Sequence, residues 1–297
     1  ATGRTMRDKI LKITAAMLFL ASVLTLNYPV ISTLYNQIQQ GKLIGRQEAE
    51  VVDLNEQERK TVWEAAKAYN WQTVQNRTRL YDAFSGEIEQ MESEYESLLN
   101  VDGSGMMGSI EIPKIAVYLP IYHGTSRDTL AKGVGHLEGS SLPVGGKGTH
   151  VVLTGHRGLP QSELFTNLDQ MEKGDVFYLR VLNRVLVYQV YETETVKPDQ
   201  VKGLAVQEGR DLVTLVTCTP YGVNSHRLFI HGKRIPYEED REISVSQIQR
   251  ETLGRWLLRQ KVFLASVVVL VAAFLAGLFI LIRRMSRRHR EKKEENS

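Results

Sequence analysis

The sequence is poor in cysteine: Cys218 is the only one among 297 residues. A single thiol excludes an internal disulfide framework and the paired cysteines of structural zinc sites. No glycine-rich phosphate loop and no internal repeat is found either, which removes the common nucleotide-binding and solenoid patterns. Cys218 ends the apolar run 212–218 (LVTLVTC), and Pro220 and Gly222 follow it. This placement predicts a thiol at a strand end, and the local sequence leaves a reactive and an inert cysteine equally open.

Charges are missing from two long stretches near the ends of the chain. Residues 262–282 contain 21 residues without a charge, which is long enough to cross a bilayer, and a basic segment, 283–297, follows. Residues 13–26 are also apolar and follow four basic residues. This first stretch reads as a signal peptide or an anchor, and no clear small-x-small cleavage site precedes Asn27, which favours an uncleaved anchor. Basic flanks mark the cytoplasmic side, so we expect both termini inside the cell and residues from about 35 to 255 outside.

The overall basic character comes from these tails. Residues 1–12 carry +3 and residues 283–297 carry +4, so the remaining chain holds −4 of a net charge of +3. The sequence pI near 8.8 therefore indicates membrane topology rather than a nucleic-acid-binding surface. We expect a membrane as a partner and no nucleic acid.

The periodicity of the expected outer part changes along its length. Residues 35–106 are expected to be helical. Helices are predicted at 55–74, with Asn55 as N-cap, and at 87–99, and an aperiodic loop at 79–86 lies between them. Residues 107–237 predict short strands typical of a barrel or sandwich, with short helical pieces near 128–132 and 164–171. A polar linker helix is expected at 238–261. The expected strands are 109–112, 117–122, 150–154, 176–181, 185–195, 212–217 and 228–235.

A thiol nucleophile needs a base or a cation close by to hold it as a thiolate. Of seven histidines, His156 resembles Cys218 in placement, because it also follows an apolar strand and precedes loop glycines. Arg227 starts the strand after Cys218 and is a candidate for stabilising an oxyanion, with Arg157 as a competitor. A packed histidine and a solvated arginine are the alternatives at these positions.

Taken together, these positions resemble the sortases, membrane-anchored cysteine transpeptidases of Gram-positive surfaces. The matching motifs are the histidine motif TGH at 154–156, the TLxTC motif at 214–218 (TLVTC) and Arg227. Residues 123–146, residues 154–175 and the second apolar span are similar to the pilus-polymerising class C. The resemblance implies a mainly β fold: an eight-stranded sortase-type barrel with short helices, preceded by N-terminal helices and flanked by transmembrane helices.

The class C resemblance also implies a lid. In that class an Asp-Pro-aromatic motif before the barrel covers the active site, its aspartate pairing with the catalytic arginine and its ring covering the cysteine. Asp82 and Phe84 match the two ends of the motif, but Ala83 stands where proline is expected. Because proline restricts the open loop, we expect this lid to open more easily than one with proline. Ordinary packing of Phe84 against the barrel is an equally compatible interpretation.

The implied activity is cleavage of an LPxTG-like sorting signal between Thr and Gly, followed by transfer of the acyl group to a lysine of another pilin subunit. Pilin subunits with such a signal are the implied partners, and no cofactor or metal is expected. The nearest alternative is a sortase that attaches proteins to a peptidoglycan-precursor amine. A thiol hydrolase and a non-enzymatic anchored scaffold with an incidental cysteine are the others.

Overall fold

The computed structural model describes residues 2–76, 80–85, 93–237 and 245–261, together with 263, 265–270, 272–274, 276–277, 280 and 283. The chain divides into two compact units. One unit comprises Ile31–Arg255, and the other comprises Ala1–Val30 with Trp256–Ser297. The two units are described separately.

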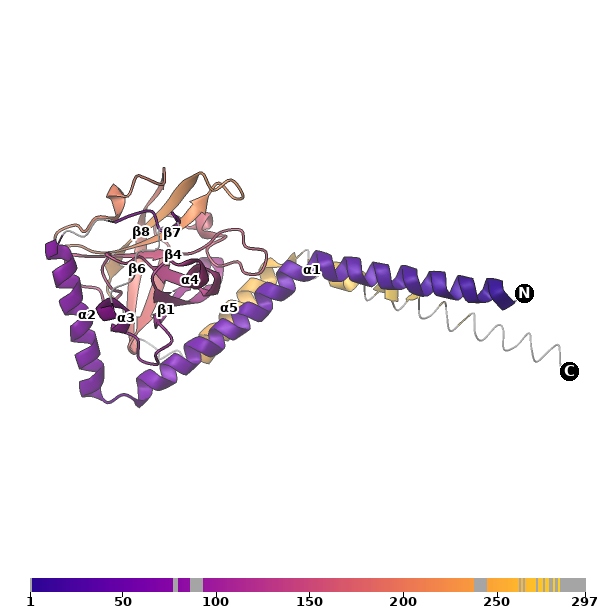
Figure 1. The fold of residues 1–297 in the computed structure, drawn as a ribbon, viewed down its shortest axis with the longest axis horizontal. Coiled ribbons are helices and arrows are strands. Elements are labelled where there is room, and N and C mark those ends of the chain that lie inside the picture. The colour runs from indigo at the N-terminus through magenta and orange to yellow at the C-terminus, as the bar shows by residue number, and fades with distance from the viewer. Residues whose placement is uncertain are drawn as a thin grey trace. The chain divides into compact units, whose positions relative to one another are not determined.

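The larger unit contains a closed barrel of eight strands in the order β1-β2-β3-β4-β7-β8-β6-β5. Figure 1 shows this unit as a ribbon and labels β1, β4, β6, β7 and β8. The β2–β3 and β4–β7 pairs are parallel and the other neighbours are antiparallel. The predicted eight-stranded sortase-type barrel is therefore confirmed. The strands are β1 (Met106–Ile112), β2 (Val117–His123), β3 (Val134–His136), β4 (Thr149–Thr154), β5 (Val176–Val181), β6 (Arg184–Val196), β7 (Asp211–Thr219) and β8 (His226–Ile235).

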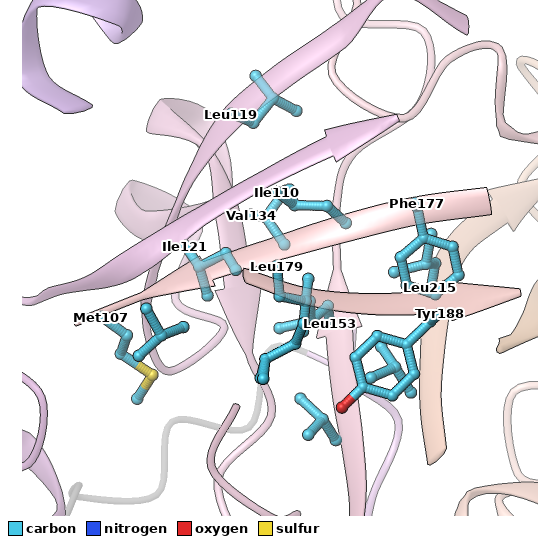
Figure 2. Packing of buried hydrophobic residues seen from close by; sticks show 14 of the residues in the cluster. Met107, Ile110, Leu119, Ile121, Val134, Leu153, Phe177, Leu179, Tyr188 and Leu215 are labelled. Carbon is cyan, nitrogen blue, oxygen red and sulfur yellow. The ribbon is translucent and has the colours of Figure 1, made fainter. Parts of the chain in front are cut away.

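Apolar side chains from neighbouring strands fill the barrel (Figure 2). Leu153 of β4 and Leu215 of β7 are register partners on parallel strands and are both fully buried. Opposite partners on adjacent strands share a face, so the β-branched and leucine-rich runs of β4 and β7 build one side of the core. Ile110 and Leu179 pair in the same way between β1 and β5, which closes the barrel.

Helices cover part of this barrel. The N-cap predicted at Asn55 is confirmed, because the backbone N–H of Glu58 donates to its side-chain oxygen (2.9 Å) at the start of α2 (Glu56–Asn76). The Glu58 carboxylate accepts in return from the Asn55 N–H (2.8 Å), which completes a capping box. Trp63 and Ala66 of α2 are buried in the barrel core cluster. The shorter helices are α3 (Ser93–Ser97), α4 (Arg127–Lys132), η1 (Pro113–Ile115), η2 (Leu168–Gln170) and η3 (Lys202–Leu204).

The expected strand ranges all fall within observed strands, but two local expectations were incomplete. The three-residue strand β3 was not predicted, since a Val-Gly-His segment is too short to show an alternating pattern. The helical piece expected at 164–171 is reduced to η2, Leu168–Gln170. The helix expected at 87–99 lies partly outside the described residues, which include only α3 from it.

The apolar N-terminal segment belongs to α1, a continuous helix from Thr2 to Asp53. Within the described part of the chain, one helix is long and apolar enough to cross a membrane, and the qualifying stretch is Met17–Asp53. The second predicted span, 262–282, lies partly outside the described residues and stays a prediction, as does the basic tail 283–297. The linker helix is represented by α5 (Val245–Arg259).

Candidate functional site

The β7–β8 hairpin brings Cys218 and Arg227 together. The two residues are register partners on antiparallel strands. Side chains at such positions have Cβ atoms about 4.5–5.5 Å apart and lie on one face of the sheet. Strand β7 continues through the cysteine to Thr219, and Cys218 is 8% exposed. The thiol predicted at a strand end therefore lies one residue before the end of β7 and is buried.

His156 lies beside this pair because of the parallel β4–β7 pairing. Thr154 pairs with Val216, and the N–H of Gly155 donates to the Val216 carbonyl (3.0 Å). His156 and Cys218 each follow these partners by two residues, so the register directs both toward the same edge of the barrel. The Thr217 hydroxyl donates to the Gly155 carbonyl (2.7 Å) and fixes the two segments at this point. No hydrogen bond joins the thiol to the imidazole in this part of the described structure.

The predicted lid residue Asp82 binds the predicted arginine. Nε of Arg227 donates to one carboxylate oxygen of Asp82 (2.7 Å) and Nη2 donates to the other (2.6 Å). Nη1 donates to the backbone carbonyls of Asn224 (3.1 Å) and His226 (3.2 Å). Bidentate charge-assisted pairing of this kind is among the stronger polar contacts in proteins. The guanidinium is therefore fully engaged while the segment 80–85 stays in place.

Phe84 covers the histidine and the arginine. Its ring centroid lies 5.6 Å from that of His156, at an interplanar angle of 43°. The Arg227 guanidinium carbon lies 5.1 Å from the same Phe84 centroid, within cation–π range. Between the two lid residues, Ala83 is buried in a small apolar cluster with residues of β4, β7 and β8. The segment thus occupies the surface in front of the three predicted catalytic residues.

The protonation equilibria in this arrangement favour neutral groups. Burial raises the pKa of the Cys218 thiol; the positive charge of Arg227 opposes this effect, and the negative charge of Asp82 adds to it. Burial lowers the pKa of His156. A thiolate next to an imidazolium is the reactive form of a cysteine–histidine pair. Burial of this site therefore favours the neutral thiol and the neutral imidazole.

Arg157, the competing candidate, has different partners. Its Nη2 donates to the Asp169 carboxylate (2.6 Å) and its Nη1 donates to the Thr219 hydroxyl (3.2 Å). These contacts and the one from Thr217 were not predicted, although Thr217 lies within the quoted TLxTC motif. Among the described residues no group of three or more His, Cys, Asp or Glu side chains is arranged to hold a metal ion.

Comparison with known proteins agrees with this geometry. The Sortase domain family matches residues 110–235. Sortase D of Bacillus subtilis is 35% identical over 131 residues, and the match covers 43% of this chain and 63% of the relative. Sortase A of Listeria monocytogenes is 30% identical over 156 residues, and the match covers 52% of this chain and 68% of that protein.

Solved structures of class C sortases are also similar. Sortase C of Streptococcus pneumoniae has a TM-score of 0.63 at 46% identity, covering 67% of this chain and all of that one. Sortase C-1 of Actinomyces oris has a TM-score of 0.56 at 46% identity, covering 60% of this chain and 99% of that chain. The closed barrel, the three side chains at its edge and the similarity to these proteins agree with one another. The chain belongs to the sortase family of cysteine transpeptidases.

Proposed function

We propose that this protein is a membrane-anchored pilus-assembling transpeptidase. It cleaves an LPxTG-like sorting signal between Thr and Gly and joins the new acyl end to a lysine of another pilin subunit. The observation that supports this most directly is the meeting of Cys218, Arg227 and His156 at one barrel edge under the segment 80–85. This arrangement supplies a nucleophile, a charge for the oxyanion and a proton carrier.

The reaction proceeds through two half-reactions, acylation of the thiol and transfer of the acyl group to an amine. The Cys218 thiolate attacks the carbonyl carbon of the Thr–Gly peptide bond, and Arg227 stabilises the negative charge that develops on the oxygen. The C–N bond then breaks, and His156, as imidazolium, gives its proton to the leaving glycine amine. A lysine amine next attacks the thioester, His156 accepts its proton, and the Cys218 sulfur leaves as thiolate. An isopeptide bond replaces the original peptide bond, with no net redox change.

The surface under the lid suits the apolar part of a sorting signal. Ala83, Phe84 and their neighbours pack on a cluster that includes Leu137, Val152 and Val216. With the lid in place the remaining cavity there has a volume of only about 10 Å³, so a peptide can bind only after segment 80–85 moves away. The same movement would free Arg227 from Asp82 and expose the thiol, which couples substrate entry to activation.

The choice of a pilin lysine as acceptor is supported by the class C relatives. The structure of the S. pneumoniae enzyme is described in terms of pilin substrate specificity, and a S. agalactiae sortase C1 belongs to pilus island 1. These two proteins are 46% and 42% identical to this chain. Helix α1 is able to anchor the protein in a membrane. Anchoring enzyme and pilin precursor in one membrane would raise their effective concentration, so tight peptide binding is not needed.

Mass spectrometry with the full-length protein in detergent tests the proposal. Wild type and Cys218→Ala are mixed with an LPxTG peptide, and we expect a thioester adduct on wild type alone. Addition of a pilin should then give a ladder of covalent oligomers. Transfer only to a peptidoglycan-precursor amine would support the cell-wall alternative, and release of free acid in the presence of both amines would indicate a hydrolase. Absence of any adduct both on wild type and on Asp82→Ala, which removes the pair between the lid and Arg227, would refute the enzymatic assignment.

A further inference from the structure

A buried arginine links the backbone segments that follow the two central catalytic candidates. Arg157 comes directly after His156, and Thr219 comes directly after Cys218. Nη1 of Arg157 donates to the Thr219 hydroxyl (3.2 Å), so a side-chain bridge connects the two segments beyond the reactive groups. On the near side, Gly155 and Thr217 already make the corresponding link (2.7 Å). The histidine and the cysteine are therefore bracketed by cross-strand contacts.

The second contact of Arg157 ties the bridge to a well-packed part of the fold. Nη2 donates to the Asp169 carboxylate (2.6 Å), and the Arg157 side chain is only 8% exposed. Asp169 lies in η2, whose neighbour Leu168 is fully buried in the barrel core, as is Phe165. The Phe165 N–H also donates to the carbonyl of His156 (3.1 Å). Both ends of the bridge are thus attached to packed structure.

The imidazole itself has few constraints of its own. Among the described residues the His156 ring makes no hydrogen bond, and it contacts the ring of Phe84 in the lid. When the lid leaves, that contact is lost, and the position of the ring depends on the backbone around residue 156. The Nε–H of Arg157 is buried without a hydrogen-bond partner. The guanidinium carbon also lies 5.9 Å from the centroid of the Tyr221 ring, so two hydrogen bonds and this cation–π contact orient the group.

We propose that Arg157 is a positioning residue for the transfer reaction: through Thr219 and Asp169 it holds the His156 backbone in register with Cys218 when the lid is open. This inference rests on the proposed function. It assigns Arg157 no contact with the substrate, and it leaves the oxyanion role to Arg227.

The kinetic test uses full-length protein in detergent with an LPxTG peptide and an amine acceptor. Thr219→Val removes one hydrogen bond with little change of shape, and Arg157→Lys keeps a cation for Asp169. Arg157→Ala removes both hydrogen bonds and the contact with the Tyr221 ring. A misplacement of about 1 Å can reduce a rate roughly 100-fold. We therefore expect kcat to fall by about that factor in Arg157→Ala, by less in the other two, and KM to stay within about twofold.

The matched control is Arg180→Lys, which alters another part-buried ion pair, with Glu111 (3.2 Å), on strands away from the site. We expect it to change the melting temperature but not kcat. An unchanged kcat in the folded Arg157→Ala and Thr219→Val variants would overturn the proposal. A raised KM with normal kcat would also overturn it, because Arg157 would then act on substrate binding.

A readout that does not depend on activity separates this inference from the proposed function. In protein with ¹³C-labelled histidine and a lid opened by Asp82→Ala, the His156 ring signal should shift or broaden in Thr219→Val and Arg157→Lys. The signal of His136, buried and hydrogen-bonded to Tyr95 (2.8 Å), should stay unchanged. An unmoved His156 signal would refute positioning by Arg157 even if the enzyme is active. A moved signal would support it even if pilin is not the substrate.

Discussion

Replacing Ala83 by proline should keep the lid closed for longer. The Ser85 N–H donates to the Asp82 carbonyl (3.0 Å), so residues 82–85 form a turn with Ala83 in its second position. Proline is favoured at this position because its ring fixes φ near the value that the turn needs. Ala83 does not have a positive φ, and within the described structure its N–H makes no backbone hydrogen bond that proline would remove. The position is therefore compatible with proline.

The expected decrease in lid opening is set by the conformational freedom of the segment in the open state. A compatible proline stabilises the ordered form by about 0.4–1 kcal/mol, because it reduces the conformational freedom of the released segment. Since about 1.4 kcal/mol corresponds to a factor of ten, the open fraction should fall about two- to fivefold. If alkylation of Cys218 by a small reagent requires lid opening, its rate should fall by the same factor. Proteolysis within the segment should slow in parallel.

The assay is alkylation of the full-length protein under conditions where lid movement is fast, followed by intact mass. Asp82→Ala removes both hydrogen bonds with Arg227, so in that background we expect the lid to be mostly open and Ala83→Pro to have little effect. The double-mutant comparison isolates the lid from any direct effect of proline on the thiol. An equal or faster alkylation rate in Ala83→Pro, with a normal melting temperature, would refute the reasoning.

The pH dependence of alkylation supplies a second prediction at the same site. Burial raises the pKa of the Cys218 thiol, the charge of Arg227 lowers it, and the negative charge of Asp82 raises it. Asp82→Asn removes the charge and loosens the lid, so the thiol should form thiolate at lower pH and the alkylation midpoint should move down. Glu64→Gln, which breaks the exposed pair with Lys67 (3.2 Å), is the matched control and should leave the midpoint in place. An unchanged or higher midpoint in Asp82→Asn would contradict the assigned cause.

Two further predictions concern the structure around the site. Gly155→Ala should lower stability by about 1–3 kcal/mol and reduce transfer activity, because the new Cβ would lie 2.7 Å from the buried ring of Phe165 and push the histidine loop outward. Thr214→Val should cost about 1–3 kcal/mol in urea unfolding, because the Thr214 hydroxyl lies between His150 Nε2 (2.7 Å) and His231 Nδ1 (2.8 Å), and valine leaves both buried nitrogens unpaired.

Matched controls for these two variants are available in the chain. Gly45→Ala lies in α1 with no atom within 4 Å of the new Cβ, and it should stabilise the helix by up to about 1 kcal/mol. Thr193→Val on the exposed face of β6 should change stability by less than about 0.5 kcal/mol. Destabilisation of the controls equal to that of Gly155→Ala and Thr214→Val would show that the named contacts are not the cause.

Local sequence patterns were sufficient to predict much of the secondary structure. Strands such as β5 and β7 were predicted from the spacing of their apolar residues and from their β-branched composition, because buried strands are rich in such side chains. The N-cap at Asn55 was predictable because capping involves residues only three apart. The three-residue strand β3 was not, since its pairing with β2 and β4 depends on segments that flank it and not on its own sequence.

By itself, the sequence determined which residue types were available for chemistry: one thiol, a histidine after a strand, an arginine opening the next strand, and an aspartate and a phenylalanine in a loop. The class C resemblance implied that Asp82 pairs with Arg227, 145 positions later. Only the tertiary structure decided the bidentate geometry of that pair and the extent to which the thiol is buried. It also decided that Arg157 joins Thr219 and Asp169 instead of facing the thiol's substrate. The physical reason is that hydrogen bonds and burial depend on distance in space, and only the folded chain sets those distances for residues that are far apart in the sequence.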